Sequence, residues 1–366
     1  MALYIGLMSG TSLDGVDGVL VDTDGSRPVV HQHLPFSEAL RNELLALNRP
    51  GDNELHRASL AANALADSCA TTVAALLQRA GVGADDVRAV GAHGQTVRHR
   101  PREFDGTGYT LQLLNGALLA ERCGIDVVCD FRSRDLAAGG EGAPLVPAFH
   151  AAQFAQPGED VAVLNLGGIA NLTLLGATAS VGGFDCGPGN ALLDHWCQRQ
   201  RGTAYDDDGR WAASGRVDPE LLERLRADAY FQRPPPKSTG RDLFNADWLQ
   251  AALHSLSTPS PADVQATLAE LTAAAAAEAL LRHAGATTRL LVCGGGAHNG
   301  HLMQRLAAWL PGVAVASTAS VGVPPEHVEA LAFAWLAQAH VERRPGNLPT
   351  VTGARGPRVL GALYPK

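Results

Sequence analysis

A pattern that occurs twice constrains the fold more than any other feature of this sequence. Residues 4–22 and residues 161–175 each contain an apolar run, a turn with glycine, and a second apolar run. Each segment is typical of two β-strands joined by a turn. Glycine turns are common in β-hairpins, so chance similarity is the alternative to duplication. Because internal repeats are a primary signal of architecture, we predict two related domains that each contribute one turn to a shared cleft.

The rest of the sequence alternates between strand-like and helical patterns. A chain of 366 residues exceeds what one core usually supports, so two domains are expected. Strands are predicted at residues 87–92, 125–129, 290–293 and 313–316, and helices at residues 54–80, 115–124, 264–285, 299–309 and 326–341. This alternation predicts an α/β fold. Residues 233–242 contain three consecutive prolines and are predicted to form a loop.

Composition excludes several classes of protein. With 46% hydrophobic and 18% charged residues, the chain is globular rather than disordered. The net charge of −8, with 29 scattered cations, argues against nucleic acid as a partner. The N-terminus lacks a signal-peptide pattern, and no run approaches the roughly 18 apolar residues needed to cross a membrane. The six cysteines show no metal-finger spacing, which fits reduced thiols in a cytoplasmic protein.

The first turn has the residue types of a phosphate-binding loop. Glycines let backbone N–H groups approach an anion, and hydroxyl groups add further donors. A carboxylate in the turn would repel phosphate unless a magnesium ion lay between them, which makes Asp14 the predicted Mg²⁺ ligand, through water. The alternative is an ordinary turn that is rich in turn residues. The predicted segment comprises Gly10, Thr11, Ser12, Leu13, Asp14, Gly15, Val16 and Asp17.

Two further glycine-bearing segments follow predicted strands. Asn165, Gly167 and Gly168 lie in the second turn, and we predict that the two turns hold opposite ends of a polyphosphate. The third segment, Gly294, Gly295 and Gly296, would let an adenine and a ribose lie against bare backbone. Its spacing, G-x-G-x-x-x-G, differs from the dinucleotide fingerprint of hydride-transfer enzymes. We therefore predict that this segment binds a nucleotide but does not serve in hydride transfer.

The segment "GGFDCGPGNALLDHW" carries a candidate catalytic base. Asp185 lies between Gly-Gly and Gly-Pro-Gly, just before a helix that Asn190 is predicted to cap. A carboxylate fixed in a rigid turn is well placed for general-base catalysis. The alternative is an ordinary turn aspartate.

Other polar residues are candidates for a substrate pocket. His93, Gln95 and Thr96 follow a predicted strand, and Arg132 and Asp135 precede a glycine-rich loop. Arg132 could bind a carboxylate through two parallel hydrogen bonds. The alternative for each is a polar loop end with a satisfied side chain. His31 and His33 alternate on a predicted strand, but no third metal ligand is evident there.

Seven of these blocks together resemble one enzyme family, 1,6-anhydro-N-acetylmuramic acid kinase. The blocks are "GLMSGTSLDGVD", "GAHGQT", "DFRSRDLAAGGEGAPLVPAFH", "LNLGGIANLT", "GFDCGPGN", "PPKSTGRDLFN" and "VCGGGAHN". They occur in order, and the resemblance extends from residue 4 to about residue 361, including "LPTVTGA". One departure is Cys186, where the family pattern often has threonine.

The resemblance implies an architecture and a reaction. The fold would be α/β, with two duplicated actin-like (ribonuclease H-like) ATPase domains around a central cleft. The first would span residues 1–130, with residues 345–366 packing back onto it, and the second residues 131–344. The enzyme would be a cytoplasmic homodimer that uses ATP and Mg²⁺ in peptidoglycan recycling. It would open the 1,6-anhydro ring with water and phosphorylate the 6-oxygen, giving N-acetylmuramic acid 6-phosphate and ADP.

The resemblance also implies roles for individual residues. Asp185 matches the catalytic base, and the three glycine-bearing segments match the ATP-binding motifs. Glu329 would contact the nucleotide, with a helix-surface glutamate as the alternative, and His93, Arg132 and Asp135 would contact the sugar. Two other functions are considered: a simple hydroxyl kinase acting on another amino sugar, and a nucleotide-switched binding module.

Overall fold

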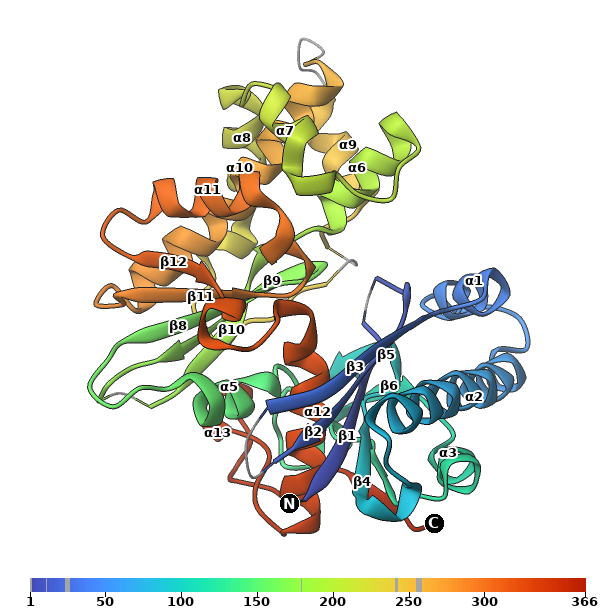
Figure 1. Cartoon of the computed structure of the whole chain (residues 1–366). Helices are drawn as coiled ribbons and strands as arrows, with labels where there is room; N and C mark the ends of the chain where they lie inside the picture. Colours follow the sequence, from blue (N-terminus) through green and yellow to red (C-terminus); the bar gives the residue numbers. More distant parts are fainter. Residues whose placement is uncertain (1, 11, 24–26, 179, 241–242, 255–258) are drawn as a thin grey trace. The chain divides into compact units, whose positions relative to one another are not determined.

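The computed structural model contains two compact units (Figure 1). Unit 1 comprises Met1–Gln153 and His327–Lys366, and unit 2 comprises Phe154–Glu326. The structure describes all residues except 1, 11, 24–26, 179, 241–242 and 255–258. Each unit is built on one mixed β-sheet with helices packed against it.

The sheet of unit 1 begins with the predicted hairpin. Its strand order is β13-β7-β4-β1-β2-β3. β1 pairs antiparallel with β2, and β2 with β3, whereas β1, β4 and β7 run parallel. The strands are β1 (Leu3–Met8), β2 (Gly15–Asp22), β3 (Arg27–Pro35), β4 (Val87–Ala92), β7 (Val127–Cys129) and β13 (Ala362–Tyr364), and β5 (Gln95–Pro101) and β6 (Gly108–Leu113) form a separate ribbon.

The sheet of unit 2 repeats this topology. Its strand order is β10-β9-β8-β11-β12, in which β8, β9 and β10 are antiparallel and β8, β11 and β12 are parallel. The strands are β8 (Val161–Leu166), β9 (Ile169–Leu175), β10 (Gly182–Pro188), β11 (Arg289–Cys293) and β12 (Ala314–Ser317). β8 therefore corresponds to β1, and β11 to β4. The predicted α/β fold with two duplicated units is confirmed.

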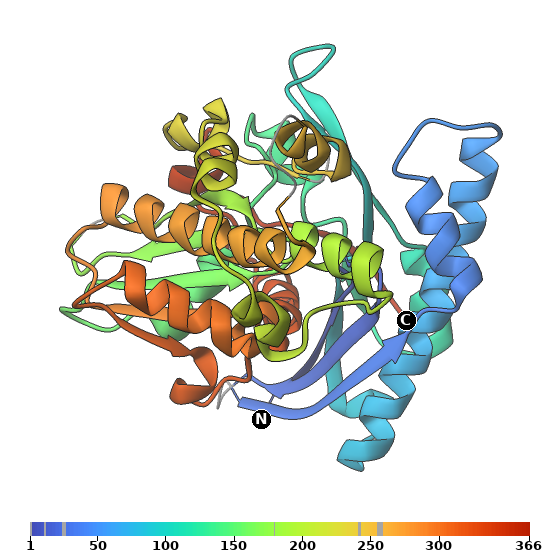
Figure 2. The ribbon, with the colours of Figure 1, turned by 90° about the horizontal axis from the view of Figure 1, so that it is seen from above.

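Helices cover both faces of the unit 1 sheet. Successive side chains of a strand point to opposite faces. Leu3, Ile5 and Leu7 of β1 pack in one core cluster with α2 (Glu54–Ala80), which Figure 2 shows from above. Gly6 faces the other way, toward the backbone of α12 (Val328–Val341). α1 (Glu38–Ala46), α3 (Gly116–Cys123), α4 (Ser133–Ala137), α5 (Val146–Phe154) and α13 (Pro349–Thr352) complete the unit.

The division into units differs from the predicted domain bounds. Residues 131–153 and 327–344 were expected in the second domain but belong to unit 1. α12 joins unit 1 because two strand glycines let its backbone lie against the sheet. A Cβ atom on Gly6 would lie 1.8 Å from the Ala330 carbonyl oxygen, and one on Gly91 would lie 2.0 Å from that of Phe333.

Unit 2 contains most of the remaining helices. They are α6 (Ala191–Arg201), α7 (Arg210–Ser214), α8 (Pro219–Arg226), α9 (Ala246–Leu253), α10 (Pro261–His283) and α11 (Gly300–Trp309). α10 contributes to two core clusters, one with the sheet and α11, and one with α6, α8 and α9. Its alanines allow this close packing on both sides.

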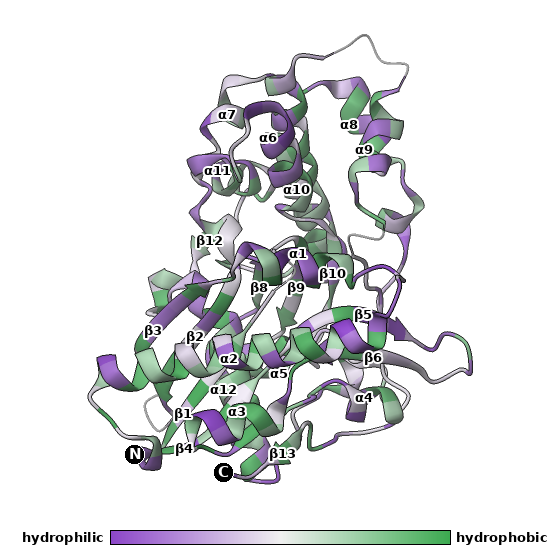
Figure 3. Cartoon of the chain, turned by 90° about the vertical axis from the view of Figure 1, so that its right-hand side faces the viewer, coloured by the Kyte–Doolittle hydropathy of each residue, from purple (hydrophilic) through white to green (hydrophobic). Residues whose placement is uncertain are grey.

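Two helices pass a test of length and composition for a membrane-spanning segment, which is only weak evidence against the expectation that no segment could span a membrane. By length and composition, α2 and α10 are both apolar enough to do so. Within the most apolar window, 83% of α10 residues and 39% of α2 residues are buried inside the chain. Their apolar residues, which can be followed in Figure 3, pack against strands and helices of their own units. Packing inside unit 2 therefore accounts for the apolar composition of α10.

Local sequence signals located helix ends well, with one error. α2 ends at Gly81, which has a φ of +67°, and Asn115 caps α3 by accepting from the Leu118 N–H. Asn190 stands at the start of α6, but its side chain does not cap that helix. It donates instead to the Leu166 carbonyl at 2.9 Å, because the β8–β9 turn lies within reach.

We predict that Gly91→Ala destabilises the protein by at least about 1–3 kcal/mol, the usual cost of overpacking a core. The added methyl group must displace the α12 backbone. Gly182→Ala is the matched control, because its methyl group would meet only Leu174 at 3.7 Å. Urea denaturation should show a lower midpoint for Gly91→Ala alone, and equal midpoints would contradict the packing described here.

Candidate functional site

Three parallel strands of unit 1 end at the same edge of the sheet. The carboxyl ends of parallel strands collect loops from distant parts of a chain. Here the segments after β1, β4 and β7 meet: the His93 N–H donates to the Leu7 carbonyl at 3.0 Å, and the Gln95 amide donates to the Gly10 carbonyl at 3.2 Å. The Ser9 hydroxyl also donates to Gln95. Residues from the predicted phosphate turn and the predicted substrate pocket are therefore neighbours.

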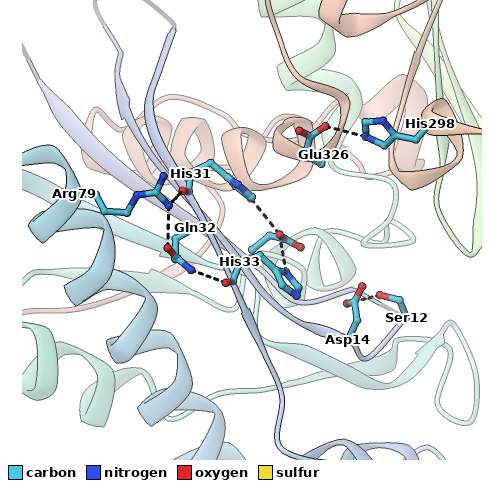
Figure 4. A network of polar contacts seen from close by, with 9 residues as sticks. Ser12, Asp14, His31, Gln32, His33, Arg79, His298 and Glu326 are labelled. Atoms are coloured by element: carbon cyan, nitrogen blue, oxygen red, sulfur yellow. Dashed lines mark hydrogen bonds and ion pairs between the residues drawn. The ribbon is translucent and has the colours of Figure 1, made fainter. Parts of the chain in front are cut away.

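The turn after β1 is shorter than predicted, because Gly15, Val16 and Asp17 belong to β2. Leu13 anchors the turn: its side chain is buried among Leu40, Leu44 and Val97, although its φ is +57°. Ser12 and Asp14 are exposed, and the Ser12 hydroxyl donates to Asp14 at 2.7 Å (Figure 4). Thr11 lies outside the described residues. Leu13 is therefore anchored in the core next to the exposed Asp14 carboxylate.

Asp17 faces the two histidines of β3. Its Oδ1 lies 3.2 Å from His31 Nε2 and 3.0 Å from His33 Nδ1. Dashed lines mark these contacts at the two labelled histidines in Figure 4. His31 also stacks on His327, with ring centroids 4.1 Å apart. Within the described part of the chain, no group of three His, Cys, Asp or Glu side chains could hold a metal ion.

The buried His93 side chain is paired with the half-buried Arg132. His93 Nε2 accepts from Arg132 Nε at 3.1 Å and lies 2.9 Å from Arg132 Nη2. Arg132 also donates to the Gly142 carbonyl at 2.8 Å. Burial, together with the adjacent guanidinium, lowers the pKa of His93 to about 3. His93 is therefore a neutral hydrogen-bond acceptor at neutral pH.

Asp135 and Thr96 have partners within the protein. The fully buried Asp135 carboxylate accepts from the Gly142 N–H, the Asn347 amide and the Thr352 hydroxyl, at 2.7–2.8 Å. The Thr96 hydroxyl accepts from Gln112 at 3.1 Å. These contacts indicate that Asp135 joins the loop before α5 to the C-terminal segment. A sugar contact from either residue stays a prediction.

The second turn occupies the same place in unit 2. β8, β11 and β12 are parallel, and Asn165, Gly167 and Gly168 follow β8. The Gly167 and Gly168 carbonyls accept from the N–H groups of Asn190 and Gly189, at 2.8 and 3.0 Å. A Cβ atom on Gly294 would lie 2.4 Å from Asn165 Oδ1, so glycine is required there. Two of the three predicted glycine-bearing segments are thus in contact.

The third segment continues into a short 3-10 helix, Gly295–His298. His298 Nε2 lies 3.2 Å from an oxygen of the Glu326 carboxylate, and both side chains are exposed (Figure 4). The Gly294 N–H donates to the Pro325 carbonyl at 3.0 Å. Glu329, the other predicted nucleotide contact, lies in unit 1, in the first turn of α12.

Asp185 lies in β10 and is held by a segment about 50 residues further along the chain. Its Oδ2 accepts from the Thr239 N–H at 2.9 Å, and its N–H donates to the Lys237 carbonyl at 3.2 Å. Its carbonyl accepts from the Tyr230 hydroxyl at 2.8 Å. Burial and the neighbouring Asp185 charge raise the pKa of Tyr230 and of Cys186. Asp185 is therefore fixed by both its backbone and its carboxylate.

Sequence reasoning missed the residues that hold Asp185. Lys237 and Thr239 lie in the block "PPKSTGRDLFN", which the resemblance includes but to which no role was assigned. The sequence around Tyr230 contains no motif that predicted a contact with Asp185. The block "PPKSTGRDLFN", which is unusual in sequence but had no assigned role, was the one indication that this segment contributes to the site.

Comparison with known proteins identifies similar sequences over the whole chain. A family model described as anhydro-N-acetylmuramic acid kinase matches residues 2–366. A protein of that name from Variovorax paradoxus is 62% identical over 370 residues, covering 99% of each chain. One from Bordetella pertussis is 61% identical, over 99% of this chain and 96% of its own.

Among solved structures, an activator of 2-hydroxyisocaproyl-CoA dehydratase from Clostridium difficile, with bound ADPNP, is similar in fold. Its TM-score is 0.50 at 12% sequence identity, and the match covers 93% of this chain and 96% of that one. At this identity the similarity concerns the fold alone.

We predict that His93 makes the protein less stable below pH 6.5. The pKa of His93 is about 3 in the folded protein against the ordinary 6.5, so only the unfolded chain takes up this proton as the pH falls. One such histidine costs about 2 kcal/mol between pH 7 and pH 5. His93→Gln should reduce the loss measured by urea denaturation by that amount. His56→Gln, at an exposed position of α2, is the control, and an unchanged loss in His93→Gln would contradict the burial argument.

Proposed function

This chain belongs to the family of anhydro-N-acetylmuramic acid kinases, and we propose that it joins hydrolysis of the 1,6-anhydro ring to phosphorylation of the 6-oxygen. The observation that carries the proposal is the match along the whole chain together with a rigidly held Asp185. The products would be N-acetylmuramic acid 6-phosphate and ADP.

Asp185 acts as the general base in this proposal. Its carboxylate takes a proton from a water molecule as the water oxygen attacks the anomeric carbon. The bond between that carbon and the 6-oxygen breaks, and its electron pair moves onto the 6-oxygen. The 6-oxygen then bonds to the γ-phosphorus of ATP, and ADP leaves. Direct transfer of the developing charge to phosphorus makes the departure of an alkoxide easier.

The glycine-bearing segments are proposed to bind ATP. The backbone of Gly10–Asp14 would donate to phosphate oxygens from one unit, and Gly167 and Gly168 from the other. Gly294–Gly296 would lie against the adenosine, and Glu329 would also contact the nucleotide. The tight contacts of Gly294 with Asn165 keep two of these segments in a fixed relation.

The residues of the first turn fit a magnesium ion. Magnesium commonly uses one or two carboxylates, with water and substrate phosphates as its other ligands. Asp14 offers an exposed carboxylate beside the Ser12 hydroxyl. Asp14 would hold the ion through water, and the ion would neutralise charge on the phosphates of ATP.

His93, Gln95, Thr96 and Arg132 remain the predicted contacts to the sugar. Because His93 is neutral, it can form hydrogen bonds with the sugar but carries no charge. Arg132 therefore supplies the positive charge of the pair. We also propose that the protein is a cytoplasmic homodimer that acts in peptidoglycan recycling. Sedimentation of the purified protein would test the dimer.

We predict that Asp185→Asn folds and binds ATP normally but loses at least about 100-fold in turnover, the usual contribution of a general base. An asparagine oxygen can still accept from the Thr239 N–H. ADP release with the anhydro sugar measures turnover. Asp207→Asn, an exposed carboxylate of the same unit, is the control. Activity like that of the wild type in Asp185→Asn would remove Asp185 from the mechanism.

Product analysis in ¹⁸O-labelled water separates the proposal from the alternative hydroxyl kinase. We expect one ¹⁸O atom at the anomeric oxygen of the phosphorylated sugar, because water opens the ring. A simple hydroxyl kinase would give a product without label. Mass spectrometry of the products reads the difference directly.

A further inference from the structure

We propose that the Thr239 hydroxyl contacts the attacking water molecule beside Asp185. The inference rests on the proposed function of Asp185 as general base. It assigns a second contact for the water, from a residue that no sequence signal marked for this role.

Thr239 is held against the candidate base by its own backbone. Its N–H donates to Asp185 Oδ2 at 2.9 Å, and two residues earlier the Lys237 carbonyl accepts from the Asp185 N–H at 3.2 Å. The segment Lys237–Thr239 therefore follows the edge of β10. Thr239 is therefore a direct neighbour of the Asp185 carboxylate through its backbone.

The segment is fixed to the core at its other end. Lys237 Nζ donates to the Tyr230 carbonyl at 3.3 Å and lies 4.7 Å from the centre of the Tyr230 ring. Burial lowers the pKa of Lys237. Tyr230 is 2% exposed, and its hydroxyl donates to the Asp185 carbonyl. Asp185, Tyr230 and Lys237 are thus joined in one network, which holds Thr239 in place.

The Thr239 hydroxyl has an unused hydrogen-bonding capacity. Its oxygen is buried and has no hydrogen-bond partner within the part of the chain that the structure describes. A buried hydroxyl without a partner costs free energy, so its presence beside a catalytic carboxylate calls for a bound molecule. Water is the smallest molecule that can donate to both groups.

The arrangement suits the ring-opening step. The water donates one hydrogen to the Asp185 carboxylate and the other to Thr239 Oγ1, which leaves a lone pair for the anomeric carbon. The new bond forms from that lone pair, the proton passes to Asp185, and the electron pair of the broken bond leaves on the 6-oxygen. Thr239 exchanges no proton, so its effect is to orient the water.

Two variants of Thr239 test this contact. Thr239→Val keeps the shape and the N–H donor but removes the hydroxyl, whereas Thr239→Ser keeps the hydroxyl. We expect Thr239→Val to lower kcat by 10- to 100-fold with little change in the KM for the sugar or for ATP. Thr239→Ser should stay within about threefold of the wild type. Thr239→Val should also unfold at about the same temperature as the wild type, because the hydroxyl has no hydrogen-bond partner to lose within the part of the chain that the structure describes.

Three outcomes would overturn the inference. They are a kcat of Thr239→Val within twofold of the wild type, a rise in the sugar KM with kcat retained, and equal losses in Thr239→Val and Thr239→Ser. The second would make the hydroxyl a sugar contact, and the third would make the residue a structural one.

The ¹⁸O assay distinguishes failure of this inference from failure of the proposed function. If the wild type incorporates label and Thr239→Val does so equally fast, only the role of Thr239 fails. If the wild type turns over the anhydro sugar without incorporating label, the proposed ring opening itself fails.

Discussion

Parallel pairing of three strands in each sheet is the constraint on which the candidate site depends. Because β1, β4 and β7 share a direction, the segments that follow them meet at one edge, although up to about 120 residues separate them in the chain. The same pairing of β8, β11 and β12 brings Gly294 against Asn165. The antiparallel hairpin that begins each sheet places its turn at this same edge. In each unit, the shared direction of the strands therefore brings the candidate site residues together at one edge of the sheet.

Polar groups among the candidate site residues of each unit serve two different purposes. Some are enclosed and saturated, such as Asp135, whose three donors join distant segments of unit 1. Others are exposed, such as Ser12 and Asp14, or carry unused capacity, such as the Thr239 hydroxyl. The difference is energetic, because a saturated buried carboxylate gains nothing from a ligand, whereas a buried hydroxyl without a partner does. Burial and partner counts thus separate framework residues from candidate contacts better than residue type does.

Local signals in the sequence predicted the elements well. Gly81 ends α2 and Asn115 caps α3, because a left-handed residue and a short polar side chain act on their immediate neighbours. Asn190 was predicted to act in the same way but donates to the β8–β9 turn instead. A side chain forms the hydrogen bond that is lowest in free energy, and a partner on a distant strand cannot be predicted from the local sequence pattern. The units are divided differently from the predicted domains for a similar reason, since Gly6 and Gly91 let α12 lie against the sheet only once the strands are side by side.

The sequence by itself determined the α/β class, the repeated hairpins, the three glycine-bearing segments, and Asp185 as the candidate base. These follow from periodicity, from the backbone freedom of glycine, and from motifs that are contiguous in the chain. The tertiary structure alone decided that Asp135 is enclosed, that His93 is a neutral partner of Arg132, and that Lys237, Thr239 and Tyr230 hold Asp185. Burial and hydrogen bonding depend on which segments the fold brings together. Contacts between residues far apart in the chain, such as Arg132 and His93, 39 residues apart, or Tyr230 and Asp185, 45 residues apart, leave no mark on local sequence.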